Sequence, residues 1–157
     1  MDAEDTEVPF LSRFFAMEYY SFILNRTFEI TLDEKGCSGA FVRGIIPTRS
    51  PGIIMAGLEN DPIHLVNSGL LEEARAHPRG SAQYLSAHRF NFSWDWSCIK
   101  SVRHNPRKKW GMGSIQHDGR FDFEHQDGTR EFIALGRGRA SDILAALRAS
   151  GRIVVTA

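Results

Sequence analysis

The chain has few cysteines, no net charge and no apolar run long enough to cross a membrane as a helix. Only two of its 157 residues are cysteines, and Cys37 and Cys98 lie too far apart in the sequence to form a metal-binding signature. The 19 acidic and 19 basic residues cancel, so the overall charge gives no reason to expect a bulk polyanion as partner. We therefore expect reduced, buried thiols, no disulfide framework, no metal and no cofactor.

The length and composition are typical of one globular domain. A chain of 157 residues is expected to bury roughly 70% of the surface that its unfolded form exposes, which is enough for a single core. We predict one domain over residues 1–157. Residues 1–7 are rich in acidic side chains, whereas secretory and mitochondrial leaders need positive charge. A cytoplasmic location is the expectation that follows.

The most apolar segment spans residues 10–24, FLSRFFAMEYYSFIL. Its large apolar side chains recur at a spacing that predicts a helix, with Pro9 in the first turn. A membrane-spanning helix needs about 20 apolar residues, and Arg13 and Glu18 interrupt this run. We expect the helix to pack on the core. Two alternatives stay open, a homodimer seam and an interfacial membrane anchor, and the dimer is preferred because anionic head groups would repel the acidic residues that precede it.

A β-hairpin is predicted over residues 26–46. Phe28, Ile30 and Leu32 alternate with polar residues, which is typical of a half-buried strand. Asp33 to Gly36 then supplies the turn, and a second strand runs over residues 38–46 until Pro47. This hairpin is expected to begin the sheet.

Residues 47–89 read as an insertion that contains one helix. Its first part is rich in proline and glycine, which predicts a long loop. Asp61 is placed to cap a helix and Pro62 to begin it, and Pro78 forbids its continuation. Residues 81–88 are compatible with a helical turn or with the start of the next strand.

The last third of the chain predicts strands followed by one helix. Phe90, Phe92, Trp94 and Trp96 alternate with polar residues, which predicts a strand with four aromatic rings on one face. Further strands are expected near residues 98, 113, 120 and 130. Two Asp-Gly pairs, 118–119 and 127–128, are typical of tight hairpin turns.

The closing helix is expected over residues 141–150. Ser141 is placed to cap it, Ile143, Leu144 and Leu147 form an apolar stripe, and Gly151 ends it. Counting gives seven strands. We predict an α+β fold: a seven-stranded antiparallel bent barrel capped by this C-terminal amphipathic helix, with an N-terminal helix and a helical insertion between the second and third strands.

This plan resembles the pleckstrin-homology (PH) superfold. The stretch FSWDWSCIKSV, residues 92–102, is similar to the hydrophobic-W-x-x-I-x-x-V stretch of bacterial PH-like and GRAM-type domains. The resemblance continues through the Asp-Gly hairpin and EFIALG to the ILAAL helix, covering residues 90–150 and, more weakly, 26–46. It implies a module that binds or scaffolds a protein or peptide partner or an anionic ligand, and not an enzyme.

Positive charge gathers in two places that are candidate binding sites. PH domains that bind phosphoinositides carry it between their first two strands, where this chain has Asp33 to Gly36, so that route is not expected. A basic loop with one Trp could hold a phosphopeptide, an anionic lipid or nucleic acid. A second group precedes the last helix and, with the amides of Gly138 and Ser141, predicts a small anion site. The candidate residues are Arg103, Arg107, Lys108, Lys109 and Trp110 in the loop, and Arg137 and Arg139 before the helix.

An enzyme is the alternative function. A small hydrolase or isomerase would use His and Asp groups, and His104, His117, Asp118, His125 and Asp127 are scattered through the last third. His125 and Asp127 lack a third ligand for a metal, and no HExxH or Cys-x-x-Cys pattern accompanies them. We therefore assign no catalytic or metal-binding residue. An enzyme would differ from a binding module in having a His and a carboxylate that converge in a pocket.

Overall fold

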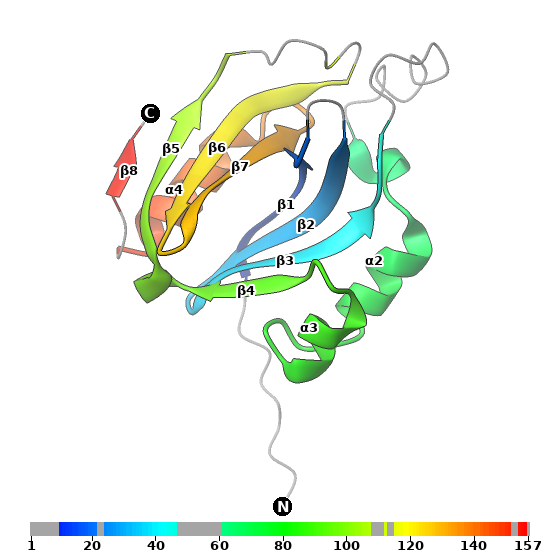
Figure 1. The fold of residues 1–157 in the computed structure, drawn as a ribbon. Coiled ribbons are helices and arrows are strands. Elements are labelled where there is room, and N and C mark those ends of the chain that lie inside the picture. The colour runs from blue at the N-terminus through cyan, green and yellow to red at the C-terminus, as the bar shows by residue number, and fades with distance from the viewer. Residues whose placement is uncertain are drawn as a thin grey trace, which may run out of the picture.

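The structure, a computed structural model, describes residues 10–21, 24–46, 61–107, 112, 115–151 and 154–156. Within these residues one sheet has the strand order β4-β3-β2-β1-β7-β6-β5-β8 (Figure 1). All neighbours pair antiparallel except β8, which joins β5 in parallel. The strands are β1 (Phe10–Tyr19), β2 (Asn25–Asp33), β3 (Gly36–Arg43), β4 (Phe92–Asp95), β5 (Ile99–Asn105), β6 (His117–His125), β7 (Gly128–Leu135) and β8 (Val154–Thr156).

Three α-helices and two 3-10 turns accompany the sheet in the described residues. In Figure 1, α2 and α3 lie beside β3 and β4, whereas α4 lies behind β5, β6 and β7 in this view. The helical elements are η2 (Pro62–Leu65), α2 (Ser68–Arg75), α3 (Ala82–Ala87), η3 (Trp96–Cys98) and α4 (Ala140–Ala149).

The sheet is curled into a half-barrel, which agrees with the predicted antiparallel seven-stranded barrel. Strand β4 forms one edge of the sheet and β5 lies next to the opposite edge strand β8, yet only η3 separates β4 from β5 in the chain. A flat sheet of this width cannot bring both ends together. Trp96 secures the corner, since its indole Nε1 donates to the carbonyl of Asp33 at 2.9 Å and its side chain is 1% exposed.

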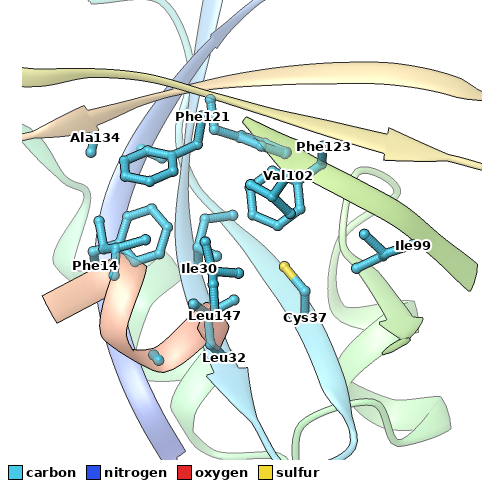
Figure 2. Packing of buried hydrophobic residues seen from close by; sticks show 14 of the residues in the cluster. Phe14, Ile30, Leu32, Cys37, Ile99, Val102, Phe121, Phe123, Ala134 and Leu147 are labelled. Carbon is cyan, nitrogen blue, oxygen red and sulfur yellow. The ribbon is translucent and has the colours of Figure 1, made fainter. Parts of the chain in front are cut away.

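The main core fills the concave side of the curled sheet. All seven antiparallel strands contribute side chains to one cluster, and Ile143, Ala146 and Leu147 of α4 complete it. Figure 2 shows Leu147 of α4 beside Phe14, Ile30 and Leu32. The predicted role of the last helix in covering the core is therefore confirmed, and Gly151 ends it with a φ of 62°.

The outer face of the sheet is also covered. Ala40 packs with Ala74 of α2 and Tyr84 of α3. A second cluster joins Met17 and Ile133 to Leu65 of η2, with further members Ile46, Met112, Ile115 and Leu135. Because both faces of β2 are buried, its charged side chains need partners inside the protein.

The predicted N-terminal helix is wrong, because residues 10–19 form the central strand β1. This strand pairs with β2 over nearly its whole length and with β7 at Ala16 and Met17. Phe14 faces the main core and Met17 the outer cluster. A strand buried on both faces has no period-two polar pattern, and its adjacent apolar residues imitate the spacing of a helix.

The correction bears on the predicted dimer seam along residues 10–24. The apolar helix face on which it was argued does not exist, and Phe14, Ala16 and Met17 are buried in the core. Residues 22 and 23 lie outside the described part of the chain. Phe10 and Tyr20 remain half-exposed at the two ends of the segment.

The predicted hairpin at Asp118-Gly119 is also wrong. Both residues lie inside β6, where the register with β7 shifts between His117 and Arg120. Gly119 has a φ of 89°, so the Asp-Gly pair forms a bulge instead of a turn. Ile115 is irregular, and residues 113 and 114 of the expected separate strand lie outside the described residues. The second Asp-Gly turn, at Asp127-Gly128, is confirmed as the β6–β7 hairpin.

The insertion and β4 differ from expectation in detail. Asp61 caps the helical segment that begins at Pro62, but the segment breaks after η2, and Asn67 caps a separate helix α2. Residues 81–88 contain the short helix α3. The aromatic strand is only four residues long, because Asp95 accepts a hydrogen bond from the amide of Ser97 and turns the chain.

Candidate functional site

A cleft of about 150 Å³ opens beside β1, between the start of η2 and the segment that precedes α4. Its apolar walls include Phe15 and Leu135. Ionic side chains from five different parts of the chain line the remainder. These side chains are Arg13, Glu29, Asp61, Arg75 and Arg139.

Glu29 forms the buried acidic centre of the cleft. It projects from the outer face of β2, and its side chain is 6% exposed. The Nη2 of Arg75 donates to Oε2 of Glu29 at 2.5 Å, and Nε of Arg75 lies 3.2 Å from the same oxygen. This hydrogen bond, with the charge of Glu29, raises the pKa of Arg75 further above its usual range. Arg75 is therefore held as a charged wall of the cleft.

Arg13 and Arg139 have spare donor capacity. The Nε of Arg13 lies 3.8 Å from Glu29 and is buried without a hydrogen-bond partner in the described residues. Arg139 is exposed at the cleft rim, and its described hydrogen bonds are made by its backbone alone. A guanidinium offers five N–H donors in a planar fork. Both side chains can therefore donate hydrogen bonds to an additional anion.

The charges of the cleft do not balance. Three guanidinium groups face two carboxylates, and Asp61 already uses Oδ1 to accept from the amide of Ile63 at 3.0 Å. Apolar walls lower the local dielectric, which strengthens an ion pair formed beside them. The arrangement can therefore hold one small anionic group, such as a carboxylate or a phosphate, between Arg13 and Arg139.

The N-terminus of α4, next to this cleft, is capped from another element. The carboxylate of Asp118 in β6 accepts hydrogen bonds from the amides of Arg139 and Ala140, the second at 2.8 Å. Arg139 occupies the N-cap position, so the predicted cap Ser141 is wrong. A carboxylate here compensates the positive end of the helix dipole. At these two amides the protein itself supplies the anion expected beside Arg137.

The predicted basic residues do not come together. Arg139 lines the cleft, whereas Arg137 is exposed and is not one of its lining residues. Arg103 projects from β5 with its side chain 66% exposed and pairs with Asp122 at 3.3 Å. Arg107 is exposed after the strand, and Lys108, Lys109 and Trp110 lie outside the described residues.

The histidines of the enzyme alternative are occupied by structural contacts. His104 stacks on Phe121, and its Nε2 lies 2.8 Å from the carbonyl of Asp118. His125 stacks on Trp94 at 4.9 Å, and its Nδ1 is 3.7 Å from Asp127. Within the described ranges, no three His, Cys, Asp or Glu side chains gather in a way that could hold a metal ion.

The sequence interpretation missed Glu29, Arg75 and Arg13. Glu29 follows the polar positions of an alternating strand, which predicts exposure to solvent. Arg75 lies 46 residues later, inside a helix that shows only an amphipathic pattern. Of these three residues, only Arg13 has a sequence signal, because a charge inside the most apolar segment of the chain requires a partner or a function.

Comparison with known proteins adds no family or function. No protein-family model matches the chain, and no curated protein matches it. None of the helices in the described residues is long and apolar enough to cross a membrane. A proposal for function must therefore rest on the chemistry of the site.

Proposed function

We propose that this chain is a non-enzymatic binding module and that its cleft receives an anionic group of a ligand or of a protein or peptide partner. The observation that carries this proposal is the convergence of Arg13, Arg75 and Arg139 around a cleft with only two carboxylates. Planar guanidinium forks suit carboxylate and phosphate oxygens. A binding role, and no covalent step, is what these groups can perform.

Each part of the cleft has a distinct task in this proposal. Glu29 and Arg75 form an ion pair that is fixed in place and lines the cleft. Arg13 and Arg139, which line the cleft, donate to the incoming anion. Phe15 and Leu135 contact the apolar part of the ligand that carries the anion. The ligand is therefore expected to combine one negative charge with a small apolar group.

The PH-like resemblance, a homodimer and a cytoplasmic setting belong to the same proposal. The PH-like resemblance is supported by the curled antiparallel sheet and by the helix that follows it and packs on the main core. Exposed Phe10 and Leu11 offer apolar surface for a second copy. Two free cysteines, Cys37 and Cys98, suit a reducing compartment.

Titration of the full chain with inorganic phosphate and with glutamate, followed by NMR, tests the cleft. Signals of Arg13 and Arg139 should shift for whichever anion binds, and the comparison of the two anions separates phosphate from carboxylate recognition. Arg139→Ala should weaken binding about tenfold or more, because a charge-assisted hydrogen bond contributes roughly 1.5–3 kcal/mol. Arg13→Lys should weaken it by a smaller factor, since the charge is kept and the fork is lost.

Arg148→Ala is the matched control, because Arg148 is an exposed arginine in the last turn of α4. This variant should bind both anions as the parent chain does. Equal weakening by Arg148→Ala and Arg139→Ala would show only a general electrostatic effect. Absence of shifts at Arg13 and Arg139 with both anions would refute the proposed site.

A further inference from the structure

A second ionic group lies on the concave face of the sheet, away from α4. Along β2 the inward side chains run from Arg26 through Phe28 and Ile30 to Leu32. Leu32 and Ile30 lie beside α4 in Figure 2. Six residues of strand span about 20 Å, so Arg26 occupies the opposite end of the concave face. Glu18 of β1 is its cross-strand partner.

Two arginines share one carboxylate at this end. The Nε of Arg26 donates to Oε1 of Glu18 at 2.8 Å. Arg130 of β7 binds the same carboxylate with both Nε and Nη2, at 2.7 and 2.8 Å. Glu18 is 8% exposed, and Arg26 and Arg130 are 18% and 26% exposed. Although burial raises the pKa of Glu18, the hydrogen bonds and charges of Arg130 and Arg26 lower it overall.

The group keeps an excess of one positive charge and several unused donors. Glu18 is the only carboxylate paired with Arg26 or Arg130 in the part of the chain that the structure describes. Arg26 uses only its Nε there, and the Nη1 of Arg130 has no described acceptor. Both side chains are partly open to solvent, so these donors can reach a ligand.

Aromatic rings hold the two guanidinium groups by their faces. The Cζ of Arg130 lies 4.5 Å from the ring centre of Phe92 and 5.3 Å from that of Trp94. The Cζ of Arg26 lies 4.3 Å from the ring centre of Phe90. Cation–π contacts of this kind orient a guanidinium so that its N–H edge stays free. Phe90 and Trp94 are themselves only half-buried and present apolar surface next to those edges.

We propose that this arginine–aromatic cluster, made of Glu18, Arg26, Arg130, Phe90 and Trp94, binds an acidic peptide segment of a partner protein. The excess positive charge selects a carboxylate side chain, and the half-buried rings select an apolar or aromatic neighbour of that carboxylate. The cluster shares no residue with the cleft beside β1. It therefore extends the proposed binding function to a second, independent site.

The test uses the full chain and two blocked tetrapeptides, acetyl-Phe-Glu-Glu-Phe-amide and acetyl-Phe-Gln-Gln-Phe-amide. The acidic peptide should shift the NMR signals of the Arg26 and Arg130 side chains, and the Gln peptide should bind about tenfold more weakly or worse. Arg26→Lys and Arg130→Lys keep the charge and remove the planar fork. Each substitution should therefore weaken binding of the acidic peptide about tenfold. Sodium acetate is titrated as a third probe.

Arg103→Lys is the matched control, since Arg103 is a strand arginine paired with one carboxylate elsewhere on the sheet. It should bind the acidic peptide as the parent chain does. Circular dichroism first establishes which variants fold. If a variant does not fold, the comparison of the two peptides on the parent chain still decides.

Several results would overturn the proposal. Equal affinity for the Glu and Gln peptides would show that charge has no role in binding. Failure of the acidic peptide to bind would refute the proposed site. Shifts at Arg13 and Arg139 instead of Arg26 and Arg130 would place the peptide in the cleft, leaving the cleft proposal intact. Acetate binding as tightly as the peptide would assign the cluster to free carboxylates.

Discussion

Asp118 of β6 caps the N-terminus of α4 by accepting a hydrogen bond from the amide of Ala140 at 2.8 Å. The bond joins residues 22 positions apart and ties the sheet to the helix that completes its core. The first-turn amides of a helix have no partner within the helix. The bulge at Gly119 places the carboxylate where it supplies one.

The first prediction follows from this cap. Asp118→Ala should lower the free energy of unfolding by about 1 kcal/mol, as loss of a cap acceptor usually does, and Asp118→Asn by less. Urea denaturation measures both. Asp127→Ala, which removes an exposed carboxylate in the β6–β7 turn, is the control and should have little effect. Equal losses for Asp118→Ala and Asp127→Ala would contradict the capping role.

The second prediction concerns the bulge itself. A Cβ on Gly119 would lie 2.3 Å from the carbonyl oxygen of Asn105, whereas a Cβ on Gly138 would meet nothing within 4 Å. Both glycines have positive φ, 89° and 75°. Gly138→Ala should therefore cost only the backbone term, about 1 kcal/mol. Gly119→Ala should cost at least ~2 kcal/mol more, because a backbone clash is added. Thermal denaturation measures both variants. Equal losses of stability for Gly119→Ala and Gly138→Ala would contradict this prediction.

The third prediction is a pH dependence of stability centred on Glu18. A carboxyl group with a lowered pKa in the folded state binds protons more readily when unfolded. Its contribution is complete above the unfolded value, about pH 4.3, and disappears as the pH falls through the lower folded pKa. Glu18→Gln should remove this part of the acid destabilisation.

At neutral pH, Glu18→Gln should also reduce stability, on the order of 2 kcal/mol, since two partly buried guanidinium groups lose their carboxylate. Urea titrations between pH 7 and pH 3 measure both effects. Glu34→Gln, at the exposed β2–β3 turn, is the control and should leave the acid profile intact. An unchanged profile in Glu18→Gln would mean that other carboxyl groups dominate the acid response.

The fourth prediction concerns the two thiols. Burial raises the pKa of Cys37 far above its usual range, and its side chain is 1% exposed, so it should resist alkylation in the folded state. Cys98 is partly exposed. Iodoacetamide should add one group to the native chain and two after unfolding, as measured by intact-mass spectrometry. A Cys98→Ser chain that is still alkylated when folded would show that the core opens.

Local patterns identified the elements in which apolar residues recur at a strand or helix period. A period or a turn signal that depends only on neighbouring residues marks four features. These are the hairpin of β2 and β3, the strand β5, the Asp127-Gly128 turn and the closing helix. Strand β1 could not be found in this way. It is buried between β2 and β7, and side chains such as Phe14 and Phe15 are apolar on both faces.

The candidate sites depended on tertiary structure even more strongly. Arg139 was a candidate from sequence because it precedes a helix, but its cleft partners Arg13 and Glu29 come from strands whose pairing the sequence does not specify. The same holds for Arg26 and Arg130, which β1 brings to one carboxylate. Ion pairs act across space and leave no local period in the chain.

The amino-acid sequence by itself determined the class of fold: an antiparallel sheet completed by one amphipathic helix. Hydrophobic periodicity and turn residues act over a few neighbours, so they can be read directly from the chain. Only the tertiary structure decided which strand lies at the centre, that Asp118 caps a distant helix, and where the arginines converge. These features arise when strands far apart in sequence pair and the sheet curls, which places charges from different segments within hydrogen-bond distance.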